Sequence, residues 1–242
     1  MTALKAQLEK ATNWLITTHK GPDGDAVGSV VAWAALAQQM QKPYLILFPD
    51  QPAAYLLPFL SQVKWEVYEQ EKAYQADAIF CLDYNAPSRV GDKMQDFVAS
   101  FPATKVMLDH HPGPEAFCDF TISKTTVCST TQVIYECLEE IGLLQHLNLT
   151  MAEGIYLGLM TDTGSFRFPS VNSKTHQIVA HLYDLGLEAH KIHEAVYDVN
   201  TVGRLQLRGY AIAEKLQLFE DKGLGIITLS RAELDKFNYQ KG

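Results

Sequence analysis

Short apolar runs alternate with segments of helical periodicity through the first part of the chain. Runs with the length and composition of buried strands occur at residues 14–18, 44–48, 78–82, 105–108 and 120–123. Helical spacing occurs at residues 4–11, 26–40 and 88–100, and Ser129 or Thr130 is a suitable N-cap for a helix after the last strand. This alternation predicts an α/β fold with a doubly wound, mainly parallel sheet and helices on both faces.

The pattern changes after residue 149, where apolar positions recur at helical spacing in successive segments. These segments are residues 151–160, 173–185, 189–199 and 204–218. Two short apolar runs, residues 216–219 and 224–228, then flank Asp221-Lys222-Gly223, which is typical of a hairpin turn. We therefore expect a catalytic domain at residues 1–186, a helical linker at 187–215 and the beginning of a small second domain at 216–242.

Composition and charge restrict the class of protein. The 242 residues carry a net charge of −8, which argues against binding to long nucleic acids because these need a basic track. No stretch reaches the roughly 20 apolar residues of a membrane span, and the N-terminus does not have the pattern of a signal peptide. The four cysteines show no CxxC spacing, which favours free thiols in a reducing compartment. We expect a cytoplasmic protein without a membrane partner.

Three clusters of acidic and histidine residues directly follow predicted strands. They are His19-Lys20-Gly21-Pro22-Asp23-Gly24-Asp25, then Asp83, then Asp109-His110-His111. The carboxyl ends of parallel strands share one edge of a sheet, so these clusters are expected to converge on one pocket. A further aspartate, Asp162, ends an apolar helix, where its charge opposes the helix dipole unless a cation compensates it.

Each cluster also has a simpler interpretation when it is taken alone. Aspartate, glycine and proline are common in turns, and aspartate often ends a strand. A pair of adjacent histidines is more often a surface feature than a ligand pair. The complete set points to a metal-dependent hydrolase, because carboxylates and imidazoles crowded into one pocket need a cation. Such a mixed set suits two divalent cations, Mn²⁺ first and Mg²⁺ or Co²⁺ as alternatives.

These motifs, in this order and with these spacings, resemble those of the DHH phosphoesterase superfamily. That superfamily includes RecJ exonucleases, family II pyrophosphatases and NrnA-type nano-RNases. The segments Asp83-Tyr84-Asn85-Ala86-Pro87-Ser88-Arg89 and Asp162-Thr163-Gly164-Ser165-Phe166 are most similar to the NrnA type. The resemblance extends from about residue 15 to residue 185.

The resemblance implies a role for each motif residue. One metal ion is expected on His19, Asp23 and Asp83, and a second on Asp25, Asp83, His110 and Asp162, with Asp83 bridging. His111 is expected to contact the substrate phosphate or assist the leaving group, and Asp109 to orient His110. Arg89, Ser129 and Thr130 are candidate substrate contacts, although Arg89 is equally interpretable as a surface residue and Ser129 and Thr130 as helix caps.

The activity implied is hydrolysis of short oligoribonucleotides or dinucleotides such as pApA to mononucleotides, and of adenosine 3′,5′-bisphosphate (pAp) to AMP. A pyrophosphatase or exopolyphosphatase, and a catalytically silent nucleotide-binding module, are the alternatives. NrnA-type proteins also have a C-terminal domain with a Gly-Gly-Gly-His segment, which this sequence lacks. We therefore expect residues 216–242 to be the start of a truncated, DHHA1-like substrate-binding domain. The oligomeric state is left open, with a homodimer as one option.

Overall fold

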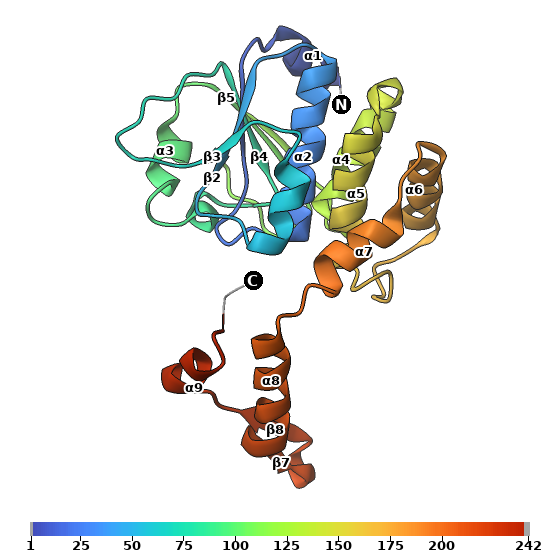
Figure 1. The fold of residues 1–242 in the computed structure, drawn as a ribbon. Helices are drawn as coiled ribbons and strands as arrows, with labels where there is room; N and C mark the ends of the chain where they lie inside the picture. The colour runs from blue at the N-terminus through green and yellow to red at the C-terminus, as the bar shows by residue number, and fades with distance from the viewer. Residues whose placement is uncertain (1, 240–242) are drawn as a thin grey trace. The chain divides into compact units, whose positions relative to one another are not determined.

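A six-stranded parallel sheet forms the centre of the first part of the computed structural model, which describes residues 2–239 (Figure 1). Its strands are β1 (Trp14–Thr17), β2 (Tyr44–Phe48), β3 (Trp65–Val67), β4 (Ala78–Leu82), β5 (Thr104–Asp109) and β6 (Phe120–Ser123). They lie in the order β3-β2-β1-β4-β5-β6, and every pairing between them is parallel. The predicted α/β fold is therefore confirmed. From β1 the chain adds β2 and β3 on one side and then returns to add β4, β5 and β6 on the other side. The strand order therefore reverses between β1 and β4, and ligands bind at such switch points.

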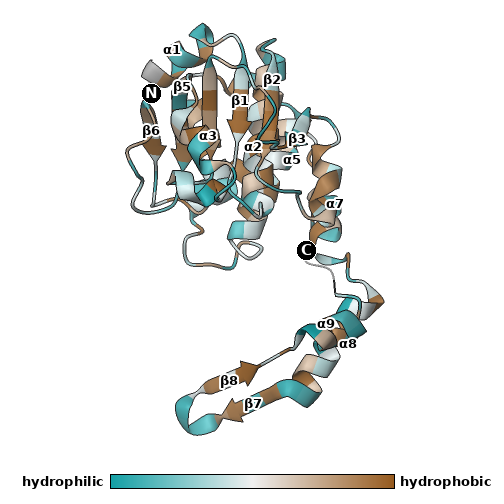
Figure 2. Cartoon of the chain, turned by 90° about the vertical axis from the view of Figure 1, so that its left-hand side faces the viewer, coloured by the Kyte–Doolittle hydropathy of each residue, from teal (hydrophilic) through white to brown (hydrophobic). Residues whose placement is uncertain are grey.

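Helices cover the sheet on both faces. The apolar strand residues are visible as brown segments within the layers (Figure 2). On one face, Trp33 of α2 (Gly24–Gln39) packs against Trp14 and Phe80, with ring centroids 6.2 and 5.3 Å apart. On the other face, Val98 of α3 (Gln95–Ser100) belongs to an apolar cluster that includes Ile79. Alternate strand residues thus enter two cores, as expected for a sheet that is buried on both sides.

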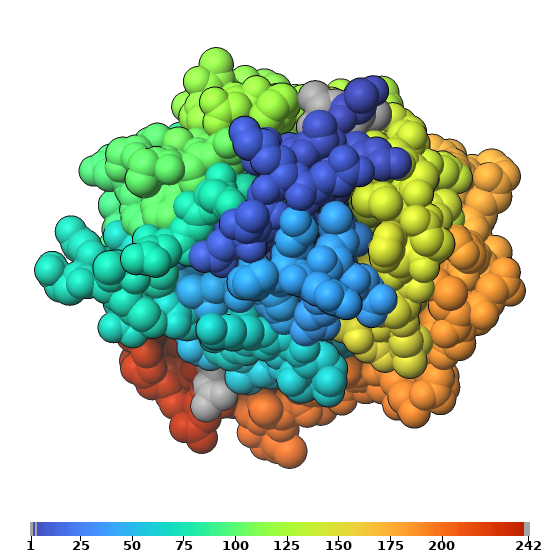
Figure 3. All heavy atoms as spheres, turned by 90° about the horizontal axis from the view of Figure 1, so that it is seen from above, coloured from blue at the N-terminus to red at the C-terminus, as the bar shows by residue number. Residues whose placement is uncertain are grey.

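The remaining helices of this part are α1 (Thr2–Lys10), α4 (Thr130–Glu140), α5 (Leu149–Asp162) and α6 (Ser173–Asp184). Helix α7 (Ala189–Tyr197) begins in this part and ends in the next unit. Helix α1 buries Leu4 and Leu8, and Figure 3 shows the N-terminal segment (dark blue) beside the yellow part of the chain. Ser129 is the N-cap of α4, as predicted, and accepts a hydrogen bond from the amide of Gln132. Short 3₁₀ turns lie at Ala54–Leu60, Pro87–Val90 and Leu144–His146.

One prediction about these elements was wrong, and one strand was not predicted. The helix expected at residues 88–100 is divided into the 3₁₀ turn Pro87–Val90 and the short helix α3, because Gly91 between them has φ 80° and cannot continue a helix. Strand β3 was not predicted, since its three half-buried residues, Trp65, Glu66 and Val67, are too few to show a period.

The crossing of α2 and α5 depends on glycine. A Cβ atom on Gly28 would overlap the carbonyl oxygen of Gly154, and one on Gly154 would meet the carbonyl oxygen of Gly28. The two helices can therefore approach until their backbones touch. A Cβ atom on Gly158, one turn further along α5, would overlap Asp25 and Thr131. This close approach brings the start of α2, the start of α4 and the end of α5 to one place.

A second compact unit begins at His193. It contains α8 (Val202–Tyr210), a π-helical turn at Ala211–Lys215, the antiparallel hairpin of β7 (Leu216–Phe219) and β8 (Leu224–Ile227), and α9 (Arg231–Lys236). The predicted hairpin is confirmed, whereas the helix predicted to reach residue 218 ends at Lys215. The last residues of the predicted C-terminal segment, 240–242, lie outside the described range. Within residues 2–239, no helix combines the length and apolar character that crossing a membrane requires.

Candidate metal centre

The predicted ligands converge at the carboxyl edge of the sheet. His19 follows β1, Asp83 follows β4, and Asp109 ends β5 just before His110 and His111. Helices supply the others, because Asp23 and Asp25 lie at the start of α2 and Asp162 is the last residue of α5. In three sets of three residues, the candidate ligand atoms lie within 4.8 Å of one another: His19, Asp23 and Asp83; Asp25, His110 and Asp162; Asp83, His110 and His111.

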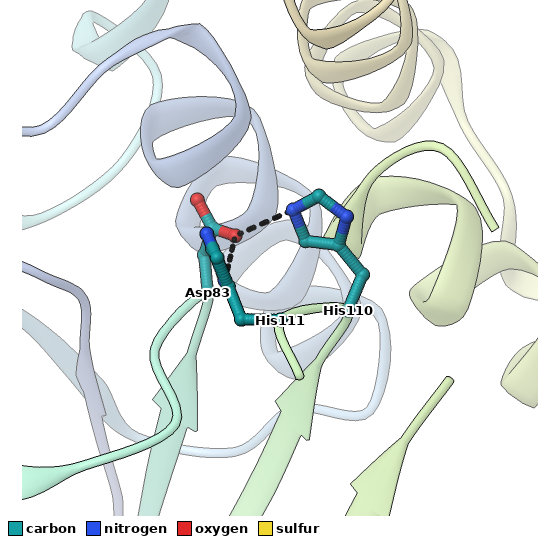
Figure 4. Close-up of side chains that lie close together, drawn as sticks. All are labelled: Asp83, His110 and His111. Carbon is teal, nitrogen blue, oxygen red and sulfur yellow. Dashed lines mark ion pairs between the residues drawn. The ribbon is translucent and has the colours of Figure 1, made fainter. Parts of the chain in front are cut away.

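Asp83 lies at the centre of these sets. Its Oδ2 atom is 3.5 Å from Nε2 of His19, and its Oδ1 atom is 3.7 Å from Nε2 of His110 and 3.8 Å from Nδ1 of His111 (Figure 4). The side chain is buried, and the backbone has φ 64°, in the left-handed region that non-glycine residues rarely adopt. Such backbone strain persists where the surroundings fix it, commonly at functional sites. The two oxygens of Asp83 thus face two different groups of ligand atoms.

The first group is His19, Asp23 and Asp83. Nδ1 of His19 lies 3.0 Å from the carbonyl oxygen of Lys20, so this nitrogen donates and Nε2 is left to face the carboxylates. Nε2 is 3.8 Å from Oδ1 of Asp23, which also caps α2 by accepting from the amides of Asp25 and Ala26. Burial alone would lower the pKa of His19, but Asp23 and Asp83 outweigh it and raise the pKa to about 10. The carboxylates of Asp23 and Asp83 therefore stabilise a positive charge at this position.

The second group is Asp25, His110 and Asp162. Nε2 of His110 is 3.3 Å from Oδ2 of Asp162 and 3.8 Å from Oδ2 of Asp25. This nitrogen is buried and has no hydrogen-bond partner among the residues that the structure describes. Burial lowers the pKa of His110, although the nearby Asp83 carboxylate opposes the shift. A neutral imidazole nitrogen that lacks a proton partner and faces carboxylates is suited to a metal ion.

The carboxylate of Asp25 is fully buried against the start of α4. Its Oδ2 and Oδ1 atoms accept hydrogen bonds from the amides of Thr130 and Thr131, at 2.6 and 3.0 Å. Burial and repulsion from Asp83 and Asp162 still raise its pKa well above the ordinary value. The helix N-terminus therefore compensates the charge only in part.

Asp162 shows the same excess of negative charge. Burial, together with repulsion from the carboxylates of Asp83 and Asp23, raises the pKa of Asp162 to about 7. Since Asp162 also ends α5, the helix dipole does not offset its charge. A divalent cation between these groups would remove the repulsion, so the residues present fit the metal centre that the motifs imply.

Asp109 binds His111, which corrects the expectation that it orients His110. Its Oδ1 atom is 2.8 Å from Nδ1 of His111, and its Oδ2 atom accepts the amide hydrogen of the same residue at 3.0 Å. This hydrogen bond is the largest cause of a raised pKa at His111. Asp109 is fully buried, whereas the side chain of His111 is 32% exposed. The buried carboxylate of Asp109 thus fixes His111 from the protein interior, while the His111 ring remains partly accessible to solvent.

The three candidate substrate contacts lie in different surroundings. Arg89 is exposed, and its positive charge opposes protonation of His111. Ser129 and Thr130 are both fully buried. The hydroxyl of Thr130 donates to Oδ1 of Asp83 at 2.8 Å, and the Ser129 hydroxyl pairs with that of Thr131. Thr131, whose backbone amide donates a hydrogen bond to Asp25, was not predicted, because contacts made by backbone amides leave no signal in the sequence.

Comparisons with known proteins agree with this geometry. The N-terminal domain of the DHH family matches residues 13–159. The chain therefore belongs to the DHH family of phosphoesterases. It is 26% identical to the bifunctional oligoribonuclease and PAP phosphatase NrnA of Bacillus subtilis, over 92% of this chain and 68% of that protein.

Two further relatives are named for different substrates. The crystal structure of an exopolyphosphatase-related protein from Bacteroides fragilis superposes with a TM-score of 0.94 at 32% identity, covering all of this chain and 72% of that one. A protein of Streptococcus suis named "Probable manganese-dependent inorganic pyrophosphatase" is 22% identical over 72% of this chain and 56% of its own length.

Proposed function

We propose that this chain is a phosphoesterase that uses two divalent cations. His19, Asp23 and Asp83 would hold one cation, and Asp25, Asp83, His110 and Asp162 the other, with Asp83 shared. When bound, two cations about 3.5–4 Å apart activate a water molecule and stabilise the attacking and leaving oxygens of a phosphate ester. The observation that carries the proposal is Asp83, whose two carboxylate oxygens face the two groups of ligand atoms.

The protein's own residues supply the remaining chemistry. The hydrogen bond from Nδ1 of His111 to Asp109 favours the protonated ring, and so leaves a proton on the accessible imidazole at the edge of the site. We assign His111 to binding the substrate phosphate or donating a proton to the leaving oxygen, with Asp109 as its positioning residue. We propose that Arg89, whose positive charge acts on His111, attracts the same phosphate. Thr130 and Ser129, being buried, would act on substrate only through the carboxylates and the helix start that they support.

The proposed substrates are short oligoribonucleotides and dinucleotides such as pApA, cleaved to mononucleotides, and pAp, converted to AMP. The name of the Bacillus subtilis relative, which matches over most of this chain, supports this choice. Manganese is the proposed metal, because imidazoles and carboxylates suit it and one relative is named as manganese-dependent. We place this activity in the cytoplasm.

A second candidate is hydrolysis of inorganic pyrophosphate or polyphosphate. It is favoured by the names of the Streptococcus suis and Bacteroides fragilis relatives and uses the same residues. The division into a catalytic domain at residues 1–186, a linker at 187–215 and part of a substrate-binding domain from 216 is likewise proposed. A catalytically silent nucleotide-binding module is the third alternative, against which the complete set of ligands weighs.

The proposal is tested by Mn²⁺-dependent hydrolysis of a diadenylate, with pAp and pyrophosphate in parallel. We expect release of AMP, loss of activity with a chelator, and loss by at least a thousandfold in Asp83→Asn with the fold retained. Hydrolysis of pyrophosphate alone would favour the second candidate. Wild-type rates in Asp83→Asn would refute the assigned centre, and nucleotide binding without turnover would favour the silent module.

A further inference from the structure

The turn after Asp162 has an unusual backbone. Gly164, Ser165 and Phe166 have φ values of 55°, 61° and 62°, so three successive residues are left-handed. Glycine adopts this conformation freely, but serine and phenylalanine each lose roughly 1–2 kcal/mol in it. Strain of this kind persists only where other contacts fix the conformation.

Thr163 fixes the turn. Its hydroxyl accepts a hydrogen bond from the amide of Phe166 at 2.8 Å, and its carbonyl oxygen accepts from the amides of Arg167 and Phe168 at 2.9 and 3.1 Å. The ring of Phe166 packs inward, with its centroid 5.6 Å from that of Tyr156. Phe166 thus anchors the turn, and the residues that follow are presented outward on a rigid backbone.

The exposed residue is Phe168, which is 51% accessible to solvent. Its inner side lies on the turn, because a Cβ atom on Gly164 would be 2.8 Å from ring atoms Cε1 and Cζ. Gly164 is two residues beyond Asp162, so the ring lies against a residue within about 7 Å of that aspartate along the chain. Arg167, beside it, is also exposed, and its Nε donates to the carbonyl oxygen of Gly164.

A single exposed aromatic ring is common on protein surfaces and by itself does not indicate a binding site. Phe168 differs in two respects. A strained turn holds it in place, and the turn starts at a candidate metal ligand, where a bound nucleotide would have its phosphate. A ring that already packs on one side against the turn loses less side-chain freedom when it binds a flat partner.

We propose that Phe168 is the platform on which a nucleobase of the substrate stacks. The proposal rests on the proposed function, because it takes the scissile phosphate to lie at Asp83, and it narrows the substrate class to molecules that carry a base. Every base has a face that can stack, so the platform would accept short oligonucleotides of mixed sequence. Inorganic pyrophosphate and polyphosphate would gain nothing from it.

The experiment compares Phe168→Leu with wild type on a diadenylate and on an abasic analogue with the same phosphodiester linkage. We expect KM for the diadenylate to rise about tenfold at unchanged kcat, within the range found when stacking aromatics are removed. Kinetics on the abasic analogue should not change. Phe168→Trp should retain the wild-type KM, and Tyr183→Leu, which removes a similarly exposed ring (52%) on α6, is the matched control.

An unchanged KM for the diadenylate in Phe168→Leu would overturn the proposal. An equal loss on the abasic analogue would overturn it as well, since it would show that the ring only supports the turn. If wild type hydrolyses neither substrate, the proposed function fails, and calorimetry with AMP then tests the platform separately. Weaker AMP binding in Phe168→Leu than in wild type would support the platform, and equal binding would refute it.

Discussion

The hydroxyl of Thr130 donates a hydrogen bond to Oδ1 of Asp83 over 2.8 Å, while the amide of the same residue donates to Oδ2 of Asp25 over 2.6 Å. One buried residue at the start of α4 thus holds Asp83, whose two oxygens face the two groups of ligand atoms, and Asp25 of the second group. Outer partners of this kind orient ligands and commonly change metal affinity 10–100-fold when removed.

We expect Thr130→Val to weaken Mn²⁺ binding by about tenfold, because Asp83 loses a donor that fixes its orientation. Thr130→Ser keeps the hydroxyl and should retain affinity within about twofold. Calorimetric titration or the electron paramagnetic resonance signal of free Mn²⁺ would measure binding directly. The metal-free Thr130→Val protein should also lose about 1–3 kcal/mol of stability, since a buried carboxylate is left short of one donor.

Equal Mn²⁺ affinity in Thr130→Val and wild type would show that the hydrogen bond does not support the centre. Equal losses in Thr130→Val and Thr130→Ser would instead indicate that the packing and shape of the whole Thr130 side chain, and not its hydroxyl alone, support the centre.

The arrangement of the candidate centre follows largely from local pattern. Strands β1 and β4 are short, mainly apolar runs that are followed within two residues by His19 and Asp83, and Asp109 ends the similar strand β5; parallel pairing then brings these ends together. No information beyond strand order is needed to place them on one edge. The cap at Ser129 was equally predictable, because it depends on neighbouring residues alone.

Contacts between distant segments could not be predicted in this way. Thr130 meets Asp25 across 105 residues, and nothing local distinguishes it from an ordinary helix-start residue. Which histidine Asp109 would bind depended on the backbone path after β5, and the turn to His111 decided it. The break at Gly91 and the short strand β3 were missed for a different reason. Each involves too few residues to change the pattern of apolar positions over the window in which a period is detected.

Asp109→Asn should lower the pKa of His111. The native carboxylate stabilises the charged imidazolium through the 2.8 Å hydrogen bond, and a neutral amide removes that charge without changing the shape. Nuclear magnetic resonance of the imidazole nitrogens in metal-free protein would follow the titration. We expect kcat for the proposed reaction to fall by about 10–100-fold, as for loss of an outer partner that orients a functional group.

Asp184→Asn, which removes an exposed carboxylate at the end of α6 outside the predicted ligand set, is the control for the change in overall charge. A His111 titration that is the same in Asp109→Asn and wild type would contradict the assignment of Asp109 as its positioning residue.

Glycine at the contact of α2 and α5 should be required for both stability and metal binding. Gly28→Ala places a methyl group against the backbone of Gly154, which cannot move aside as a side chain can. We expect a loss of about 1–3 kcal/mol in the free energy of unfolding, as for overpacked cores. Gly158→Ala should in addition weaken Mn²⁺ binding, because its methyl group would displace the Asp25 carboxylate.

Gly209→Ala is the matched control, since this helical glycine of α8 has open space around its Cα atom. It should stabilise the protein by up to about 1 kcal/mol through helix propensity alone. Chemical denaturation measures all three variants, and a Gly28→Ala protein as stable as wild type would mean that the helices can separate without cost.

Asp162 makes the stability of the metal-free protein depend on pH. Its pKa in the folded protein is about 7, above the ordinary value of about 4, so the folded state holds this proton more tightly than the unfolded state. The stabilisation is complete below pH 4 and is lost as the pH rises through 7. His19 contributes with the same sign, because its pKa is raised from 6.5 to about 10, and its stabilisation is lost as the pH rises through that range. Asp83 contributes with the opposite sign, because its pKa is lowered in the folded protein.

Asp162→Asn removes the unfavourable charge. With a chelator present, we expect it to stabilise the protein at pH 8 by on the order of 1–3 kcal/mol and to have little effect at pH 4. Saturating Mn²⁺ should reverse the order at pH 8, because wild type is expected to bind the ion more tightly and ligand stabilisation grows with the logarithm of the ratio of free Mn²⁺ to Kd. Asp184→Asn, at the exposed end of α6, controls for removing a helix-terminal charge. Thermal unfolding across pH, with and without Mn²⁺, gives the answer. If Asp162→Asn is the less stable protein in chelator at pH 8, the carboxylate is favourable without a cation, and the electrostatic argument for the metal centre fails.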